Sequence, residues 1–204
     1  MVDSVKQSGA IRSPFVGHQL GILADRFGNV GVEIRAGTLQ SVHLIATWCS
    51  GLPGLVQALT GIFNDLPGPT GTTRETPLGL LLRTGPEEFL LIGSGNEDTT
   101  TQLRAAIEAG VGSVTDLSHA RCYIHVSGVQ CRSVMGKLFA LDLRETEFPV
   151  EQIRLTGTHH VPCILHRLGP DTFRIFVFTT YAYDQLSTVM DAAREYGVSL
   201  TAVA

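Results

Sequence analysis

Residues that could perform chemistry together are most concentrated in the segment TDLSHAR, residues 115–121. It carries a carboxylate, a hydroxyl, an imidazole and a guanidinium at Asp116, Ser118, His119 and Arg121. A nucleophilic site needs such groups to converge in space, whereas neighbours along an extended strand point to alternate sides. We therefore expect a structural role, in which Asp116 accepts backbone N–H groups and Arg121 pairs with a carboxylate.

Seven histidines make a metal site the next chemistry to consider. His159 and His160 are adjacent, so in a strand they would point to opposite faces and could not readily share one ion. No spacing among the histidines matches a known ligand pattern. His43 and His125 are flanked by apolar residues, which favours packed, hydrogen-bonded side chains. We therefore expect no metal on this chain.

Signals for a cofactor or a nucleic acid are also weak. The loop GSGNED, residues 93–98, lacks the lysine of a phosphate-binding loop and the glycine spacing of a dinucleotide fingerprint. Trp48, the single tryptophan, stands at the end of an expected strand and is interpreted as a core or interface residue. With 15 Lys and Arg against 19 Asp and Glu, the chain has a net charge near −4 and no basic stripe for a phosphate backbone. The chain is predicted to be non-catalytic.

Composition predicts a soluble cytoplasmic protein. Hydrophobic residues make up 44% of the 204 residues, enough to build one large core or two small ones. The polar N-terminus lacks a signal-peptide core, and no run approaches the length of a membrane helix. The four cysteines, Cys49, Cys122, Cys131 and Cys163, show no Cys-x-x-Cys pair and are expected to be reduced core thiols.

A repeated phrase reveals the organisation that must position these residues. RTGPEEFLLIG, residues 83–93, returns as RLGPDTFRIFV, residues 167–177. In each copy a β-rich run leads into Gly-Pro-acid-x-Phe and out into another, which predicts a hairpin. Pro86 and Pro170 suit the second position of a type I turn. Phe89 and Phe173 would begin the return strands.

Helical periodicity surrounds both hairpins. Apolar residues repeat at helical spacing near residues 55–62, 103–107, 134–138 and 186–193, with Gly110 and Gly197 ending the second and fourth patterns. Strands are expected at 41–47 and 122–128 before each first helix, and at 111–117 and 197–203 after each second helix. Each half then reads strand, helix, hairpin, helix, strand. This order predicts an α+β fold of two ferredoxin-like βαββαβ units in tandem. The open sheet face of each unit would be covered by the other unit or by partner proteins.

The repeat spacing also suggests domain boundaries. We expect an N-terminal arm at residues 1–19, a first half at 20–112 and a second half at 113–204, and the halves may exchange strands and count as one domain. LPGPTGTT, residues 66–73, is interpreted as an exposed connection. FPVEQ, residues 148–152, is its counterpart.

Residues 13 to about 197, and most clearly those from 78 onward, resemble the gamma subunit of heterotetrameric sarcosine oxidases. The residues that carry the resemblance are Asp116, Ser118 and Arg121 in a D-x-S-x-x-R segment, Ser127-Gly128, Asp142-Leu143, Phe148-Pro149, the Gly169-Pro170-Asp171 turn, and Phe173-Arg174. This family is related to the folate-binding aminomethyltransferases of the glycine cleavage system. The resemblance implies a fold like the aminomethyltransferase folate-binding domain.

The resemblance further implies a non-catalytic structural subunit, with no catalytic, cofactor-binding or metal-binding residue of its own. Its partners would be the alpha, beta and delta subunits of a complex that oxidatively demethylates sarcosine to glycine. FAD, FMN, NAD, tetrahydrofolate and zinc are expected on those partner chains. Asp116, Ser118, Arg121, Gly169, Pro170, Asp171 and Phe173 would serve structure or interfaces.

Two other classes of function stay open at this point. One is a free-standing, folate-dependent aminomethyltransferase-like enzyme that uses a cleft between the halves, lined by Asp116 or Arg121. The other is a tandem ferredoxin-like sensor that binds a small effector between its units.

Overall fold

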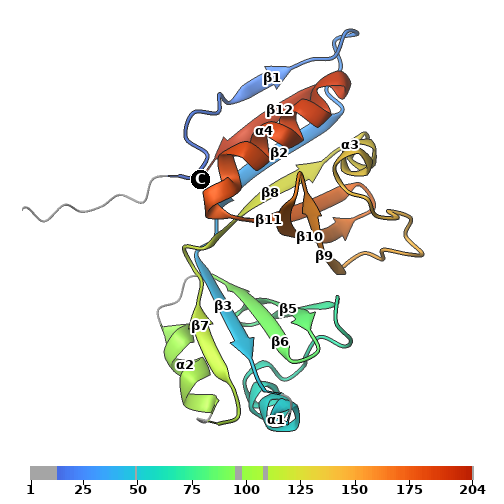
Figure 1. The fold of residues 1–204 in the computed structure, drawn as a ribbon. Helices are drawn as coiled ribbons and strands as arrows, with labels where there is room; N and C mark the ends of the chain where they lie inside the picture. Colours follow the sequence, from blue (N-terminus) through green and yellow to red (C-terminus); the bar gives the residue numbers. More distant parts are fainter. Residues whose placement is uncertain (1–12, 49, 95–97, 108–109, 204) are drawn as a thin grey trace, which may run out of the picture.

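The computed structural model describes residues 13–203, except residue 49 and the segments 95–97 and 108–109. In this part of the chain the strands form one five-stranded and one seven-stranded sheet, which Figure 1 shows one above the other. The first twelve residues of the predicted arm and Cys49 lie outside the described residues. No helix in the described residues combines the length and hydropathy that a bilayer crossing requires.

The first half forms the predicted ferredoxin-like unit. Its elements are β3 (Ser41–Ala46), α1 (Leu52–Phe63), β4 (Thr73–Thr76), β5 (Gly79–Gly85), β6 (Glu88–Gly93), α2 (Asp98–Ala106) and β7 (Ser113–Asp116). The sheet order is β4-β5-β6-β3-β7, so the closing strand lies beside the first strand and the hairpin lies on the other side. The short strand β4, which begins at the last residue of the connection at 66–73, is the one addition to the predicted unit.

The second half repeats this plan. Its elements are β8 (Arg121–Ser127), α3 (Cys131–Leu138), β9 (Ile153–Thr158), β10 (Val161–Gly169), β11 (Thr172–Phe178), α4 (Ala182–Ala193) and β12 (Val198–Val203). The hairpin β10-β11 joins β8 in the same way that β5-β6 joins β3. The α+β fold of two ferredoxin-like units is therefore confirmed.

The N-terminal segment makes the two halves differ in architecture, because its strands join only one of the two sheets. β1 (Gly21–Leu23) and β2 (Val32–Thr38) join the sheet of the second half, whose order is β1-β12-β2-β8-β11-β10-β9. β2 lies between the closing strand β12, to which it is parallel, and β8, to which it is antiparallel. The proposed boundary at 112/113 therefore does not separate the two sheets. β1 and β2 precede it but join the sheet of the second half, and β7 follows it but pairs with β3 of the first half. As a division into domains, that boundary stays a prediction.

A glycine allows β2 to enter between the two strands. Gly197 precedes β12 with φ +72°, and a Cβ there would collide with the carbonyl oxygen of Asn29. The carbonyl of Gly197 accepts hydrogen bonds from the backbone N–H groups of Gly31 and Val32, both at 3.1 Å. Only glycine adopts this backbone conformation readily. The entry of the N-terminal segment therefore depends on residue 197.

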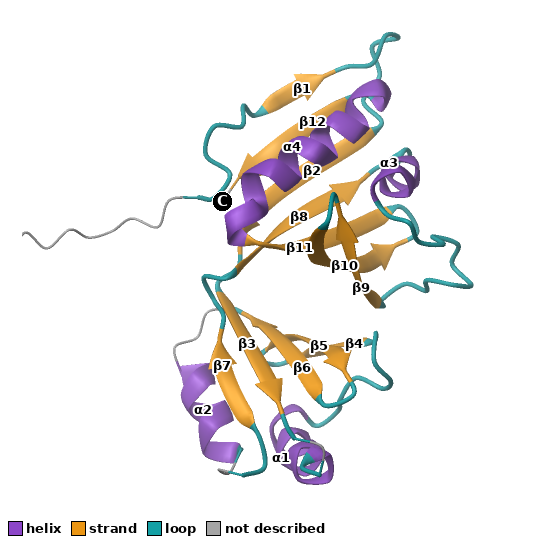
Figure 2. Cartoon of the chain, viewed as in Figure 1, coloured by secondary structure: helices purple, strands orange, loops and turns teal. Residues whose placement is uncertain are grey.

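Three apolar clusters divide the molecule into layers. Helices α3 and α4 pack on one face of the seven-stranded sheet, and α1 and α2 pack on one face of the five-stranded sheet (Figure 2). A third cluster joins the remaining faces of the two sheets and contains Val42, Leu80, Leu82, Leu90, Ile153, Ile164 and Phe176. The prediction that each half covers the open sheet face of the other is correct, and burial of this apolar surface holds the halves together.

Three predictions for single residues can be compared with the structure. His159 and His160 do not lie in a strand: they form the turn between β9 and β10, both exposed and both with positive φ. Trp48 is 61% exposed, so it is not a core residue, and its alternative role at an interface stays a prediction. Cys122, Cys131 and Cys163 are buried free thiols, as predicted.

Candidate functional site

The segment TDLSHAR connects the two sheets, running from β7 of the first to β8 of the second. Its acidic residue orders the crossing: Asp116 Oδ1 accepts hydrogen bonds from the backbone N–H of Ser118 at 2.9 Å and from its hydroxyl at 2.5 Å. The Ser118 hydroxyl oxygen in turn accepts a bond from the N–H of Val42, in β3, at 3.1 Å. The Ser118 hydroxyl and then its backbone N–H hold the pKa of Asp116 below its usual value. The two side chains thus fix the chain where β8 begins.

Arg121 is the first residue of β8, directly opposite Phe178 in β11. Its guanidinium carbon lies 4.3 Å from the centre of the Phe178 ring, a cation–π contact. Nε and Nη1 are buried and have no hydrogen-bond partner in the described residues. The expected ion pair with a carboxylate is not found within the described part of the chain, so that prediction is wrong. Arg121 presents unused donors instead.

Arg121 also lines a cavity of about 510 Å³ between the two sheets. The first half contributes Leu44, Thr84, Glu88 and Leu90 to its walls, and the connecting segment contributes Leu117. The second half contributes Arg121, Leu155, Thr156, Pro162, Cys163, Ile164 and Phe178. Ligand sites in proteins have this range of volume and this mixture of many apolar walls with a few polar groups. A cleft between the halves lined by Arg121 was one of the sequence hypotheses, whereas Asp116 does not line it.

A second charge faces the same cavity. Glu88, at the start of β6, accepts a hydrogen bond at Oε1 from the Thr84 hydroxyl at 2.6 Å. Glu88 and Arg121 do not form an ion pair within 4.0 Å, although the carboxylate is close enough to oppose the lowering of the Arg121 pKa that burial causes. Burial raises the pKa of the Cys163 thiol to about 11, so this cysteine is a neutral wall rather than a nucleophile.

The other predicted site residues lie at the opposite end of the same strand pair. Arg121 pairs with Phe178, whereas Ser127 pairs with Thr172, so the Gly169-Pro170-Asp171 turn lies about 20 Å along the strands from Arg121. There Asp171 forms an ion pair with Arg132 at 2.9 Å, and Phe173 is fully buried in the core of its half. The structure does not bring the two family motifs into one site, and their roles in structure or interfaces stay predictions.

Sequence reasoning did not single out Glu88, Thr84 or Phe178. These residues come from three strands in two sheets, and nothing in their spacing indicates that they share a cavity. Glu88 carries a weak signal, because it belongs to the repeated phrase and its counterpart in the second copy is the uncharged Thr172. The charge at this position is therefore specific to the first half.

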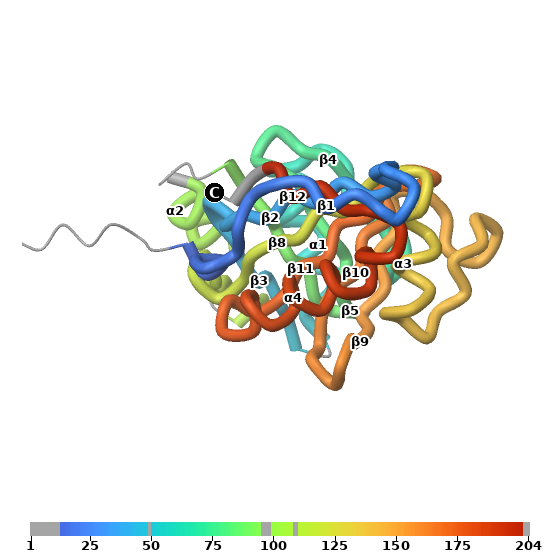
Figure 3. The backbone as a smooth tube through the Cα atoms, turned by 90° about the horizontal axis from the view of Figure 1, so that it is seen from above, coloured from blue at the N-terminus to red at the C-terminus, as the bar shows by residue number. Residues whose placement is uncertain are grey.

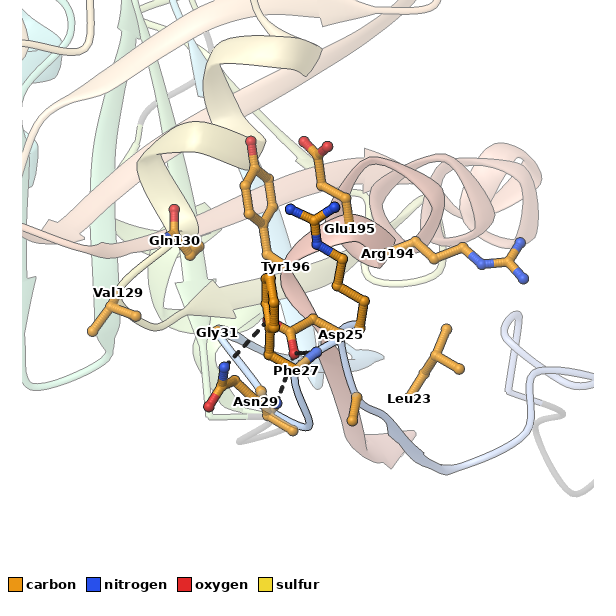
Figure 4. Close-up of a pocket in the computed structure, with 13 residues that line it drawn as sticks. Leu23, Asp25, Phe27, Asn29, Gly31, Val129, Gln130, Arg194, Glu195 and Tyr196 are labelled. Carbon is orange, nitrogen blue, oxygen red and sulfur yellow. Dashed lines mark hydrogen bonds between the residues drawn. The ribbon is translucent and has the colours of Figure 1, made fainter.

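A second hollow lies at the outer edge of the seven-stranded sheet, shown in Figure 4. It has a volume of about 900 Å³ and is lined by the turn that follows β1 together with residues around Val129 and Tyr196. Asp25 Oδ1 shapes this turn by accepting bonds from the N–H groups of Phe27 and Asn29, both at 2.8 Å. The Phe27 ring, beneath the Arg26 guanidinium, is 72% exposed. Such an open apolar rim suits a protein neighbour more than a small molecule.

Two of the described histidines, His43 and His166, are buried. His43 is buried and its Nε2 lies 2.6 Å from the Thr100 hydroxyl, as predicted for a hydrogen-bonded core histidine. His166 is buried between the sheets without a hydrogen-bond partner in the described residues, and burial, assisted by the charge of Arg174, lowers its pKa to about 4. Across the described part of the chain no three His, Cys, Asp or Glu residues are grouped so as to hold a metal ion.

Comparison with known proteins relates this chain to one enzyme complex. The model of the sarcosine oxidase, gamma subunit family matches residues 71–195. Sarcosine oxidase subunit gamma of Corynebacterium sp. (strain U-96) is 27% identical over 170 residues, which cover 83% of this chain and 77% of that protein. The corresponding subunit from Arthrobacter sp. is 27% identical over 167 residues, covering 82% of this chain and 76% of the relative.

Solved structures support the relationship. A chain of the heterotetrameric sarcosine oxidase from Corynebacterium sp. U-96 superposes with a TM-score of 0.70 at 27% identity, over 81% of this chain and 85% of that chain. The aminomethyltransferase T of the glycine cleavage system from Bartonella henselae has a TM-score of 0.63 at 16% identity, over 85% of this chain and 48% of that chain, and thus shares the fold. Because the family model matches more than half of the 204 residues, this chain belongs to the sarcosine oxidase gamma subunit family.

Proposed function

We propose that this chain is the gamma subunit of a heterotetrameric sarcosine oxidase and serves it as a non-catalytic structural subunit. The complex would oxidatively demethylate sarcosine to glycine, with tetrahydrofolate accepting the one-carbon unit. The observation that carries this proposal is the match to proteins named sarcosine oxidase subunit gamma over most of both chains. The alpha, beta and delta subunits would be its partners and would hold FAD, FMN, NAD, tetrahydrofolate and zinc.

An apolar surface supports assembly into such a complex. We call residues 16–30 the N-terminal apolar strip, because their large hydrophobic side chains are largely exposed: Val16 67%, Leu20 58%, Ile22 72%, Leu23 47%, Phe27 72% and Val30 40%. The strip contains β1, the edge strand of its sheet, which lies at the top of Figure 1 and nearest the viewer in Figure 3. An exposed apolar edge strand invites pairing with another chain. We propose that a partner subunit covers it.

Co-expression tests the proposal. The tagged chain is produced with candidate large flavin-binding chains from the same genome, and the purified material is analysed by size-exclusion chromatography, flavin absorbance and sarcosine oxidation. We expect a yellow complex that contains this chain and whose yield falls sharply when the chain is omitted. If the isolated chain is monodisperse, binds tetrahydrofolate and transfers one-carbon units without partners, the free-standing aminomethyltransferase-like enzyme is the correct reading.

A matched pair of variants locates the interface. Ile22→Glu places a charge in the N-terminal apolar strip and should reduce the recovered complex at least about tenfold, since a buried unpaired charge is costly. Gln57→Glu places the same charge on the exposed side of α1, at the opposite end of the molecule in Figure 1, and should leave recovery unchanged. Circular dichroism of both variants checks that each chain folds. Equal recovery of the two complexes would exclude the strip as the interface.

A further inference from the structure

The cavity between the sheets contains two opposite charges that do not neutralise each other directly. Arg121 comes from the second half and Glu88 from the first, and both line the same space of about 510 Å³. They form no ion pair within 4.0 Å, and the buried Nε and Nη1 of Arg121 have no hydrogen-bond partner in the described residues. Nε and Nη1 have almost no accessible surface, so a ligand in the cavity would be bound by Nη2, the guanidinium nitrogen that is not among these enclosed atoms. Two opposite charges that line one cavity without forming an ion pair are typical of a ligand-binding site.

The polar groups define what the ligand must carry. Arg121 would donate from Nη2 to a carboxylate, since a guanidinium pairs readily with this anion. Glu88, already oriented by its 2.6 Å hydrogen bond from Thr84, would accept a protonated amine on the other wall. A simple carboxylate would face repulsion from Glu88, and a simple amine would face repulsion from Arg121. A zwitterion satisfies both charges at once.

The remaining walls define the body of the ligand. Four apolar residues of the cavity wall belong to the apolar cluster between the sheets or pack against it: Leu44, Leu90, Leu117 and Ile164. Phe178 supports the Arg121 guanidinium from below, so the donors keep their direction. An apolar side chain of modest size would fill this space and exclude water from the charged contacts, which strengthens them.

We propose that the cavity between the two sheets binds a free α-amino acid with a small or medium apolar side chain, with its carboxylate on Arg121 and its ammonium group on Glu88. This site is separate from the activity proposed for the complex and adds ligand binding to a subunit with a structural role. Since both halves contribute to it, an occupied cavity would hold the two sheets together and stabilise the whole chain.

Calorimetric titration tests the proposal with glycine, L-alanine and L-leucine as probes. The purified full chain is titrated; should it require its partners for solubility, the complex is compared with the same complex carrying Arg121→Gln. We expect saturable binding of at least one probe at millimolar or lower concentration. For leucine, the analogues that lack one charge, 4-methylpentanoate and 3-methylbutylamine, should bind at least about tenfold more weakly, because each leaves one wall unpaired. Absence of saturable binding for all three amino acids overturns the proposal.

Variants separate this site from any other amino-acid site in the complex. Arg121→Gln and Glu88→Gln should each weaken binding about tenfold or more. Arg132→Gln removes an arginine outside the cavity and should have no effect. Leu155→Trp blocks the rim at a residue that is 56% exposed and removes neither charge, so it should abolish binding even if the charge variants fold poorly. If Leu155→Trp still binds the amino acid, the proposed site is wrong. Loss of complex formation in any of these variants concerns the proposed function and not the amino-acid site.

Discussion

The two copies of the repeated hairpin show how one local sequence acquires different surroundings. In the first copy Arg83 donates from Nη2 to the carbonyl of Pro86 at 2.9 Å, and in the second Arg167 donates from Nη2 to the carbonyl of Pro170 at 3.2 Å. Each guanidinium lies over the phenylalanine at the second position of the return strand, at 5.4 Å and 5.6 Å from the ring centre. The phrase R-x-G-P-x-x-F is therefore one arginine-supported turn, made twice.

The difference lies in what covers the arginine. Arg83 is half-buried and has one further bond, to the carbonyl of Gly68 at 2.7 Å. Arg167 is completely buried, because the chain after α3 passes over it and supplies the carbonyls of Leu143 at 3.1 Å and Phe148 at 2.7 Å. Identical turn chemistry thus serves a surface in one half and a core in the other. The comparison teaches that the cost of changing such a residue is decided by the loop above it.

The largest expected effect separates the two arginines. Arg167→Ala should lower the free energy of unfolding by about 4 kcal/mol, because it leaves several buried carbonyls without a donor. Arg83→Ala, the matched change, should cost about 1 kcal/mol. Urea unfolding of the purified chains followed by circular dichroism measures both. Equal losses would show that the covering loop contributes little.

A second matched pair probes the inserted strand β2. Gly197 and Gly110 follow the last helices of the two halves, both with positive φ, but a Cβ at residue 110 would meet nothing within 4 Å. Gly197→Ala should therefore cost about 3 kcal/mol, since it adds a collision with Asn29 to the backbone strain. Gly110→Ala should cost about 1 kcal/mol. Thermal unfolding compares them, and hydrogen exchange at residues 32–38 should rise in the first variant alone.

The third prediction concerns pH and the space between the halves. Burial lowers the pKa of His166 to about 4 in the folded chain, whereas an unfolded histidine titrates near 6.5. Below about pH 6.5 the unfolded chain therefore takes up a proton that the folded chain refuses, and stability falls until about pH 4. His166→Leu should remove about 2 kcal/mol of this loss.

The measurement for this prediction is a difference between two proteins. His43 and His125 also have lowered pKa values, chiefly through burial, and add to the slope of stability against pH. Urea unfolding at a series of pH values is therefore compared between the original chain and His166→Leu, with a change at the exposed His119 as the control. Parallel curves for the original chain and His166→Leu would mean that His166 is hydrated in the folded state.

The smallest expected effect falls on the acidic residues of the two turns. The Asp171–Arg132 ion pair is about half exposed on both sides, so Asp171→Ala should change stability by no more than about 0.5 kcal/mol. Glu87→Ala, at the same position of the first turn, should behave alike. A loss of complex recovery in Asp171→Ala, without loss of stability, would assign this family residue to a subunit interface.

Sequence reasoning could reach the fold because its signals are local and repeated. The Gly-Pro turns and the apolar periodicity of 186–193 each depend on residues close in the chain, and both copies agree. It could not predict the position of β2, because this strand pairs with β12 and β8, which are both distant from it in sequence. Nor could it show that His159 and His160 form a turn rather than a strand, because that depends on how β9 and β10 pair.

For the candidate site, the difference between what sequence reasoning could and could not predict is larger. The polar segment at 115–121 could be recognised as unusual, and Asp116 could be expected to bind backbone N–H groups, because these interactions span two residues. The partner of Arg121 could not be foreseen: Glu88 and Phe178 reach the same cavity only when two sheets pack face to face.

By itself, then, the sequence determined two βαββαβ units, their turns and their membership of one family. The tertiary structure decided which arginine is buried, where the N-terminal strand enters and which two charges share a cavity. The physical reason is the separation along the sequence of the residues that interact. Turn geometry and periodicity arise from neighbours along the chain, whereas burial and electrostatic partnership arise from apolar surfaces that meet only after both halves have formed.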